Sequence, residues 1–400
     1  MDHCKIATAV IGAAWGDEGK GLLTDAFSDS STVVIRHNSG AQAGHTVQMD
    51  DGRRHVFHHF GSGTFRGAAT YLSQFFVCNP LAFGYEKKAL TDATDTTPTV
   101  YAHPDCLVTT PWDMMLNQMA EEARGSARHG SCGMGFNETI QRSRNPHLAL
   151  TVGNIVDMAS LDLCKYLDRI RNDYVPARLK ELGITPSQAW SNRLASPGAL
   201  SMFMDACANF LGTVLITRDA KDDVFTKSKK IVFEGAQGLL LDARRGTFPY
   251  VTNSRTGLTN IVSLAHTIGL ETLQIIHATR AYATRHGAGP FLRESPELKY
   301  EDNTNLPNEW QGTLRFGELD IDLLTESIRL DYADQSLSEL RIERCLAVTC
   351  LDQVGHSINY WDKDARKTTE HAEFLECLRE RSGVQNIITS HGPTRSCVSL

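Results

Sequence analysis

The chain has no excess of positive charge and no long apolar run. Its formal net charge is −7, from 40 Lys and Arg residues against 47 Asp and Glu residues. General nucleic-acid binders need a basic face, so this balance argues against that class of protein. No apolar stretch approaches the ~18 residues of a transmembrane helix, and the first residues lack the apolar core of a secretory signal. We therefore expect a cytoplasmic protein with neither nucleic acid nor a membrane as a partner.

The cysteines and histidines lack the spacings of a disulfide framework or a zinc site. The ten cysteines include no CxxC pair, and the fifteen histidines form no HExxH motif. In a chain of 400 residues, cysteines without a regular frame indicate reduced thiols. A zinc centre is not indicated either.

Predicted strands alternate with predicted helices along the chain. Apolar runs at residues 6–11 and 273–278 predict buried strands, whereas residues 160–182 have helical periodicity. This alternation predicts an α/β fold with a mostly parallel central sheet and flanking helices, whose ligands bind at the carboxyl ends of the strands. No repeat or domain boundary is evident. We expect a single domain over residues 1–400, with a helical insertion at about 155–225.

The first predicted strand runs into a glycine-rich loop, residues 12–21 (GAAWGDEGKG). A strand that turns through glycines into a helix directs backbone N–H groups and the helix dipole at one point, where a phosphate can bind. Lys20 adds a point charge for a phosphate oxygen. The loop is not a Walker A motif, because Ala14 replaces its first glycine and Gly21 replaces its Ser/Thr. It predicts a P-loop-like nucleotide site, and the alternative is an ordinary strand–helix turn with a surface lysine.

Asp17 and Glu18 lie inside this loop. An acid beside a phosphate is useful chiefly when there is a metal ion to bind or a proton to move. A lone Asp in such a loop is often only a turn residue or a helix cap. A lone His after Gly, such as His45 in the second glycine-rich loop at residues 40–46, is equally often structural. The two loops together favour the functional interpretation.

The motifs resemble those of the adenylosuccinate synthetase family, in the family's order and over nearly the whole chain. The matching blocks are residues 15–21 (WGDEGKG), 40–46 (GAQAGHT), 234–238 (EGAQG) with Asp242 and residues 250–252, then 281–291 and 390–393. The resemblance implies a Mg²⁺-dependent homodimeric ligase that joins aspartate to C6 of inosine monophosphate through a 6-phosphoryl intermediate, driven by GTP hydrolysis.

The resemblance also implies residue roles. Asp17 is the base for the N1 proton and a Mg²⁺ ligand, and the Gly44 carbonyl is a second Mg²⁺ ligand. His45 stabilises the transferring phosphoryl group, and Gln237 contacts the nucleotide substrate as a third catalytic residue, although a Gln between glycines can simply be an exposed turn residue. The implied nucleotide-binding residues are Gly16, Gly19, Lys20, Gly21, Gly44, Thr46, Asp352, Ser390, Gly392 and Pro393.

Several implied substrate-binding positions depart from the family pattern. The implied set is Gln42, Ser131, Cys132, Arg142, Thr252, His286, Thr313 and Arg315. Cys132 stands where the family has Thr, Gln42 where it has Asn, and His286 where it has Val beside the ribose. Arg142 matches a family arginine that crosses to the nucleotide phosphate of the other subunit. Arg144 is the alternative match. For both arginines, the alternative to a functional role is an ordinary surface salt bridge.

Two further segments differ from the family pattern: the one expected to bind the base of the triphosphate donor (the donor-base segment) and the one expected to bind the amino acid. Residues 350–352 read Cys-Leu-Asp where the family has Lys-Leu-Asp, so the Asp352 carboxylate still suits guanine while the lysine stem is lost. GTP is therefore the expected donor and ATP the alternative. Only Arg315 and Thr313 remain to bind the carboxylates of aspartate. A dicarboxylic amino acid is bound best by bidentate arginine partners. The amino acid could accordingly differ.

Two other functions are compatible with these departures. One keeps the chemistry but acts on deoxyguanylate, for a modified viral DNA; His286, Cys132 and the altered loop before Arg315 support it, and the retained Asp17 argues against it. The other is an inactive nucleotide-binding regulator. The intact residues of the first two loops argue against that function.

Replacing Asp17 with Ala should abolish turnover and leave the fold intact, because the base for the purine proton is lost. Phosphate release in the presence of all substrates measures the turnover, and circular dichroism checks the fold. A near-normal rate would show that the proton leaves by another route.

Overall fold

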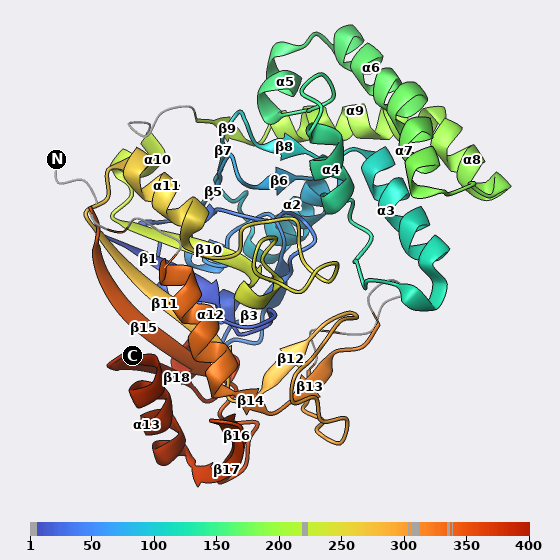
Figure 1. Cartoon of the computed structure of the whole chain (residues 1–400). Coiled ribbons are helices and arrows are strands. Elements are labelled where there is room, and N and C mark those ends of the chain that lie inside the picture. Colours follow the sequence, from blue (N-terminus) through green and yellow to red (C-terminus); the bar gives the residue numbers. More distant parts are fainter. Residues whose placement is uncertain (1–5, 218–222, 303–304, 306–311, 334–336, 338) are drawn as a thin grey trace.

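The computed structural model describes residues 6–217, 223–302, 305, 312–333, 337 and 339–400, and a ten-stranded sheet runs through their middle (Figure 1). In spatial order its strands are β19 (Val398–Ser399), β18 (Asn386–Ser390), β15 (Arg341–Thr349), β11 (Thr272–Arg280), β1 (Ile6–Gly12), β10 (Lys230–Gly238), β2 (Thr32–Arg36), β5 (Ala69–Leu72), β7 (Val100–Ala102) and β9 (Leu215–Ile216). Every neighbouring pair is parallel except β18 with β19. The predicted α/β class with a mostly parallel sheet is confirmed.

The central strand β1 is buried and largely apolar on both faces. In β1, Ala9, Val10 and Ile11 have no exposed surface, as expected of a parallel strand covered by helices on both sides. Val10 pairs with Glu234 of β10 on one side and with Ile276 of β11 on the other. Since all three strands run in the same direction, the loops that follow them meet at one edge of the sheet.

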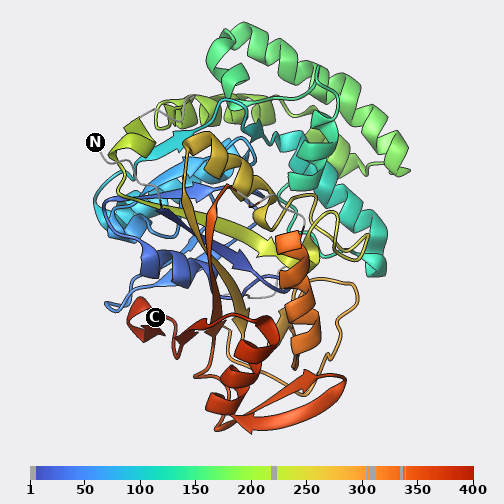
Figure 2. The ribbon, with the colours of Figure 1, turned by 60° about the vertical axis from the view of Figure 1, so that its left-hand side comes forward.

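Helices cover the faces of the sheet, and further helices lie beyond its two ends (Figures 1 and 2). They are α1 (Lys20–Phe27), α2 (Pro80–Thr94), α3 (Pro111–Arg124), α4 (Phe136–Ser143), α5 (Val152–Asp157), α6 (Ser160–Arg169), α7 (Val175–Leu182), α8 (Gln188–Ala195), α9 (Pro197–Leu211), α10 (Asp223–Lys227), α11 (Leu258–Ile268), α12 (Ile321–Ala333) and α13 (His371–Ser382). Helices α5–α9 gather at one end in both views, and α13 lies at the opposite end. None of the helices in the described part of the chain is long and apolar enough to cross a bilayer.

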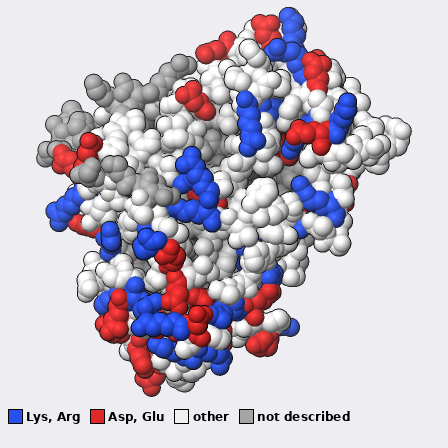
Figure 3. Space-filling model, in the orientation of Figure 1, with Lys and Arg blue, Asp and Glu red and all other residues white. Residues whose placement is uncertain are grey.

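Within the described residues, nine further short strands form four small sheets. These are β3 (His45–Gln48) with β4 (Arg54–Phe57); β6 (Val77–Cys78) with β8 (Leu107–Val108); β12 (Ala283–Arg285) with β13 (Arg315–Gly317); and β14 (Leu319–Asp320), β16 (Ser357–Asp362) and β17 (Ala365–Glu370). On the face that Figure 3 displays, charged side chains of both signs crowd the end where β16, β17 and α13 lie. Opposite charges pair there, as in Arg366 with Glu318.

A short strand lies within the range expected for the helical insertion, about residues 155–225. Helix α9 stops at Leu211, and Leu215–Ile216 then return to the central sheet as edge strand β9. Between α6 and α7 the chain forms one π-helical segment, Ile170–Tyr174. Pro176 follows it in the first turn of α7, and a proline there lacks the N–H that would continue the regular hydrogen-bond ladder.

Arg142 has a different role from the one that the resemblance implied. Thr110 and Asp113 form a capping box at the start of α3, and the buried Arg142 of α4 donates to both carboxylate oxygens of Asp113 at 2.9 Å. Its remaining donors bind the carbonyls of Val108 and Leu148. The prediction that Arg142 reaches a nucleotide in another subunit is therefore wrong, because its charge and its donors are used inside the fold.

Replacing Asp113 with Ala should lower the free energy of unfolding by about 3–5 kcal/mol, because the Arg142 charge would remain buried without its carboxylate. Urea unfolding measures the loss. The control is Arg144→Ala: this arginine is exposed, so its removal should cost less than about 0.5 kcal/mol. A similarly small loss for Asp113→Ala would contradict the assignment.

Candidate active site

The carboxylate of Glu18 organises the first loop from inside. Its Oε1 accepts hydrogen bonds from the backbone N–H groups of Ala14 (3.0 Å) and Gly16 (2.8 Å), and its Oε2 lies 2.7 Å from Lys20 Nζ. Glu18 and Lys20 are both nearly fully buried. A Cβ on Gly12 would stand 2.3 Å from Glu18 Oε2, so only glycine leaves room for this carboxylate. The loop is thereby preformed, with the first turn of α1 supplying N–H groups for a phosphate.

Asp17 projects from this loop towards the segment that follows β11. Its φ is +64°, an unusual conformation for a residue other than glycine. Its carbonyl accepts a 2.6 Å hydrogen bond from Arg280 Nε, and its Oδ2 lies 3.4 Å from His286 Nε2. The sequence pointed to Asp17 and His286 separately, without indicating that they meet.

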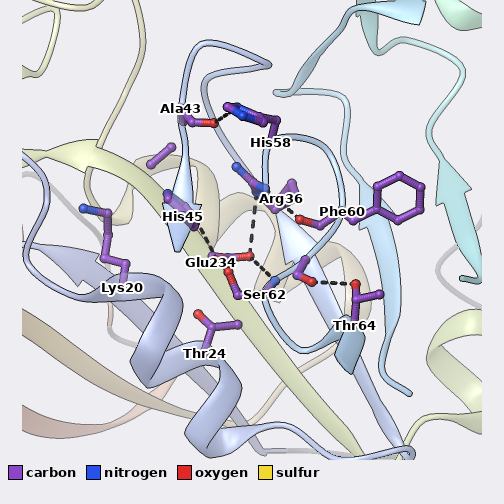
Figure 4. A network of polar contacts seen from close by, with 12 residues as sticks. Lys20, Thr24, Arg36, Ala43, His45, His58, Phe60, Ser62, Thr64 and Glu234 are labelled. Atoms are coloured by element: carbon purple, nitrogen blue, oxygen red, sulfur yellow. Dashed lines mark hydrogen bonds and ion pairs between the residues drawn. The ribbon is translucent and has the colours of Figure 1, made fainter. Parts of the chain in front are cut away.

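His45 is oriented by a buried carboxylate that sequence reasoning did not single out. Its Nδ1 lies 2.6 Å from Glu234 Oε1. The Glu234 carboxylate also accepts from the hydroxyl of Ser62, and from the Ser62 backbone N–H at 3.1 Å. Arg36 Nε is 3.9 Å from its other oxygen. Figure 4 shows these side chains converging on Glu234, which has no exposed surface.

The charges of this cluster follow from its burial. Burial alone would raise the pKa of the Glu234 carboxyl, but the neighbouring His45 and Arg36 and the Ser62 hydrogen bond hold that pKa at about 2. Burial lowers the pKa of His45, with Glu234 opposing the effect. Because a carboxylate can only accept, His45 carries its proton on Nδ1. Its buried Nε2 has no hydrogen-bond partner among the described residues, so it is available to a ligand.

The first two loops lie against each other. A Cβ on Gly21 would stand 2.8 Å from the carbonyl oxygen of Thr46 and 3.2 Å from Cβ of His45. The helix N-terminus and the imidazole therefore border the same space. His58 holds the second loop in place, because its Nδ1 donates to the carbonyls of Ala41 (3.0 Å) and Ala43 (2.8 Å; Figure 4).

These loops offer oxygen ligands for Mg²⁺. The Asp17 side chain is about one quarter exposed, and Gly44 is exposed beside His45. No group of three or more His, Cys, Asp or Glu side chains that could hold a metal occurs within the described residues. Mg²⁺ commonly uses only one or two carboxylates and takes its other ligands from phosphates and water. The donor set of Asp17 and the Gly44 carbonyl fits such an ion.

The predicted acceptor-site residues come from loops that border this centre. Gln237 has a φ of +64°, and its Cα would lie 3.7 Å from a Cβ on Gly16. The Cys132 Sγ is 3.9 Å from the Gln42 carbonyl, and burial raises the pKa of this thiol to about 11. Ser131 donates its hydroxyl to Asn117. Elsewhere in the set, the Thr252 N–H donates to the Leu241 carbonyl at 2.8 Å.

The predicted donor-base residues lie at the end of β15 and around β18. Asp352 and Pro393 are exposed, and the Leu351 N–H donates to the Ser390 carbonyl. The hydroxyl of Ser390 donates to the Gly392 carbonyl at 2.8 Å. These contacts place the two base-binding segments next to each other.

Thr349 joins the end of β15 to the first loop. Its hydroxyl donates to the Glu18 carbonyl at 3.1 Å. A Cβ on Gly19 would stand 3.0 Å from the Thr349 side chain. The donor-base segment therefore begins directly beside the phosphate loop.

The residues predicted to bind the amino-acid substrate make contacts other than those expected. Arg315 pairs with Glu294 and also donates to the carbonyls of Gly287 (3.2 Å) and Gly289 (3.0 Å). An amino-acid carboxylate would thus share this guanidinium with Glu294. Thr313 is exposed. Most of the preceding loop, residues 303–304 and 306–311, lies outside the described part of the chain.

Comparison with known proteins identifies the family of this site. The sequence model of adenylosuccinate synthetase matches residues 9–395. The chain belongs to the adenylosuccinate synthetase family. The adenylosuccinate synthetase of Thermoplasma acidophilum is 28% identical over 87% of this chain and 76% of its own length. That of Microcystis aeruginosa is 32% identical over 71% and 62% respectively. The family is one of ligases that form a C–N bond.

Solved structures show the same adenylosuccinate synthetase fold. The fully ligated adenylosuccinate synthetase of Plasmodium falciparum superposes with a TM-score of 0.70 at 17% identity, covering 98% of this chain and 99% of the other. The succinoaminodeoxyadenylate synthetase of cyanophage S-2L, bound to dGMP and to dATP as an energy donor, gives a TM-score of 0.60 at 16% identity, with 99% and 95% covered.

Replacing Glu234 with Gln should lower kcat about 10- to 100-fold, because the amide still accepts from His45 but no longer stabilises an imidazolium. Phosphate release under saturating substrates measures the effect. Ser62→Ala, which keeps the carboxylate and removes one of its donors, is the matched control and should cost less. Equal rates for Glu234→Gln and the wild type would show that His45 works without this charge.

Proposed function

We propose that this protein condenses L-aspartate with C6 of inosine monophosphate and cleaves GTP in the same reaction, with Mg²⁺ bound at the first two loops. The observation that carries the proposal is the meeting of three features at one edge of the sheet: the N-terminus of α1, the Asp17 carboxylate, and the His45–Glu234 pair. Family membership supports the reaction class.

The chemistry needs a better leaving group at C6 than oxide. In our proposal, Asp17 removes the N1 proton while O6 attacks the γ-phosphorus of the triphosphate, and the bond to the β-phosphate breaks to leave GDP. The amine of aspartate then adds at C6, loses a proton, and expels phosphate. Each step transfers a group already present in the substrates, so no further co-reactant is needed.

His45 would act on the transferring phosphoryl group. A dianionic ligand at Nε2 favours the protonated imidazole, and the ionised Glu234 on the other side stabilises that cation, as a carboxylate does for the histidine of a catalytic triad. Lys20 adds positive charge at the same place, at the cost of its pairing with Glu18. Bound Mg²⁺ would be held by Asp17 and the Gly44 carbonyl and would supply charge neutralisation at the phosphates.

Deoxyguanylate is the second candidate acceptor, and His286 is the observation that favours it. His286 Nδ1 is buried and makes no hydrogen bond to any described residue. With Nε2 directed at Asp17, Nδ1 could accept a hydrogen bond from a purine 2-amino group. A valine could not do so. ATP stays the alternative donor, since Cys350 provides no lysine stem beside Asp352. The homodimer and the cytoplasmic location stay predictions.

A phosphate-release assay tests the proposal directly. With Mg²⁺, aspartate and either GTP or ATP, inosine monophosphate and deoxyguanylate are offered in parallel. We expect release that requires both the acceptor and aspartate, and it should be fastest with inosine monophosphate and GTP. Release with deoxyguanylate alone would establish the second candidate. Tight nucleotide binding without turnover on either acceptor would overturn the ligase proposal in favour of a nucleotide-binding regulator.

A further inference from the structure

Arg280, the last residue of β11, contacts three segments of the candidate site at once. Its Nε donates to the Asp17 carbonyl at 2.6 Å, its Nη1 to the Tyr282 hydroxyl at 2.9 Å, and its Nη2 to Asp302 at 3.2 Å. The side chain is only 10% exposed. No sequence motif pointed to it, since a single arginine at a strand end has many ordinary uses.

The first of these contacts holds a strained residue. Asp17 is in the left-handed region, which side-chain-bearing residues populate only when their surroundings impose it. Arg280 binds its carbonyl, and the hydroxyl of Thr349 binds the next carbonyl, that of Glu18, at 3.1 Å. Both carbonyls are thereby turned towards the ends of β11 and β15. The orientation of the Asp17 peptide thus depends on these two side chains.

The second contact continues to the donor-base segment. The Tyr282 hydroxyl donates to Gln353 Oε1, and Gln353 Nε2 donates to the Glu301 carbonyl at 2.8 Å. Gln353 directly follows Asp352, the residue expected to read the donor base. Tyr282 is buried and stacks on Tyr300 with ring centroids 3.9 Å apart. Arg280 therefore connects the Asp17 peptide to the base-reading turn through one rigid aromatic side chain.

The third contact reaches the start of the amino-acid segment. The Asp302 carboxylate accepts from Arg280 and also from the backbone N–H and side-chain amide of Asn305, at 2.9 and 2.8 Å. Asp302 and Asn305 lie ahead of Thr313 and Arg315, the residues that the resemblance assigned to the amino acid.

We propose that Arg280 is a positioning residue that sets the Asp17 peptide relative to the donor-base turn. The inference rests on the proposed function, in which Asp17 removes the purine proton and Asp352 reads the donor base. Three donors in a fixed planar fork are what this role requires, and a lysine has one nitrogen on a flexible stem. Arg280 touches none of the three substrates in this scheme. It acts through the residues that do.

The test compares Arg280→Lys with the wild type in steady-state phosphate release. We expect kcat to fall about 100-fold, the scale that a misplacement near 1 Å produces, with KM for the acceptor nucleotide changed by less than about threefold. Tyr282→Phe keeps the ring and removes the hydroxyl, which both accepts from Arg280 Nη1 and donates to Gln353. Because the contact of Arg280 with the Asp17 carbonyl remains, this variant should raise KM for the triphosphate more than it lowers kcat. Arg329→Lys, at an exposed arginine paired with Glu326, is the matched control and should behave as the wild type.

The outcomes separate this inference from the function on which it rests. If the wild type turns over and the folded Arg280→Lys variant has the same kcat, the positioning role alone is overturned. A change in acceptor KM without a change in kcat also overturns it, because that pattern indicates direct substrate binding. Should Arg280→Lys fail to fold, an unaltered triphosphate KM in Tyr282→Phe overturns the link to the base turn. Absence of wild-type turnover overturns the proposed function, and the inference with it.

Discussion

The buried carboxylate of Glu234 is the point on which the candidate site depends. It stands on the central strand β10, where its charge would be costly without partners. Its partners come from elsewhere: Arg36 from β2, Ser62 from the loop after β4, and His45 from β3. Satisfying one buried charge therefore joins the second loop to the sheet and leaves His45 Nε2 without a hydrogen-bond partner among the described residues. The same contacts therefore stabilise the buried carboxylate and orient the His45 imidazole.

A second buried carboxylate, Glu18, plays the corresponding part in the first loop. It binds two loop N–H groups and Lys20 and leaves the helix N-terminus to a phosphate. The two carboxylates shape neighbouring parts of one candidate site: Glu18 holds a preformed loop that can bind an anion, and Glu234 orients the His45 imidazole. Buried ion pairs are weak evidence for stability in general. The buried pair of Arg142 and Asp113 has a structural role instead, because it joins α3 to α4 and Arg142 also donates to the carbonyls of Val108 and Leu148.

Much of the fold and part of the site could be predicted from the sequence, for local reasons. The strand before the first loop is apolar throughout, the glycines of the loop exclude a regular helix until Lys20, and Pro111 marks the start of α3. Local patterns also misled. Leu215 and Ile216 are apolar and follow a helix closely, yet they form an edge strand because β7 offers an edge for pairing there. Arg142 has the position of a ligand-binding arginine and a buried acid as its partner.

The sequence by itself determined the family, the α/β class, the order of the loops and the residues Asp17, Lys20 and His45, since each follows from a short stretch of chain. Only the tertiary structure decided what those residues touch. Glu234 is 189 residues from His45, and Arg280 is 263 residues from Asp17. Such contacts arise because parallel strands distant in sequence end at one edge of the sheet. Burial then requires each charge at that edge to find a partner, and no local pattern records which partner it finds.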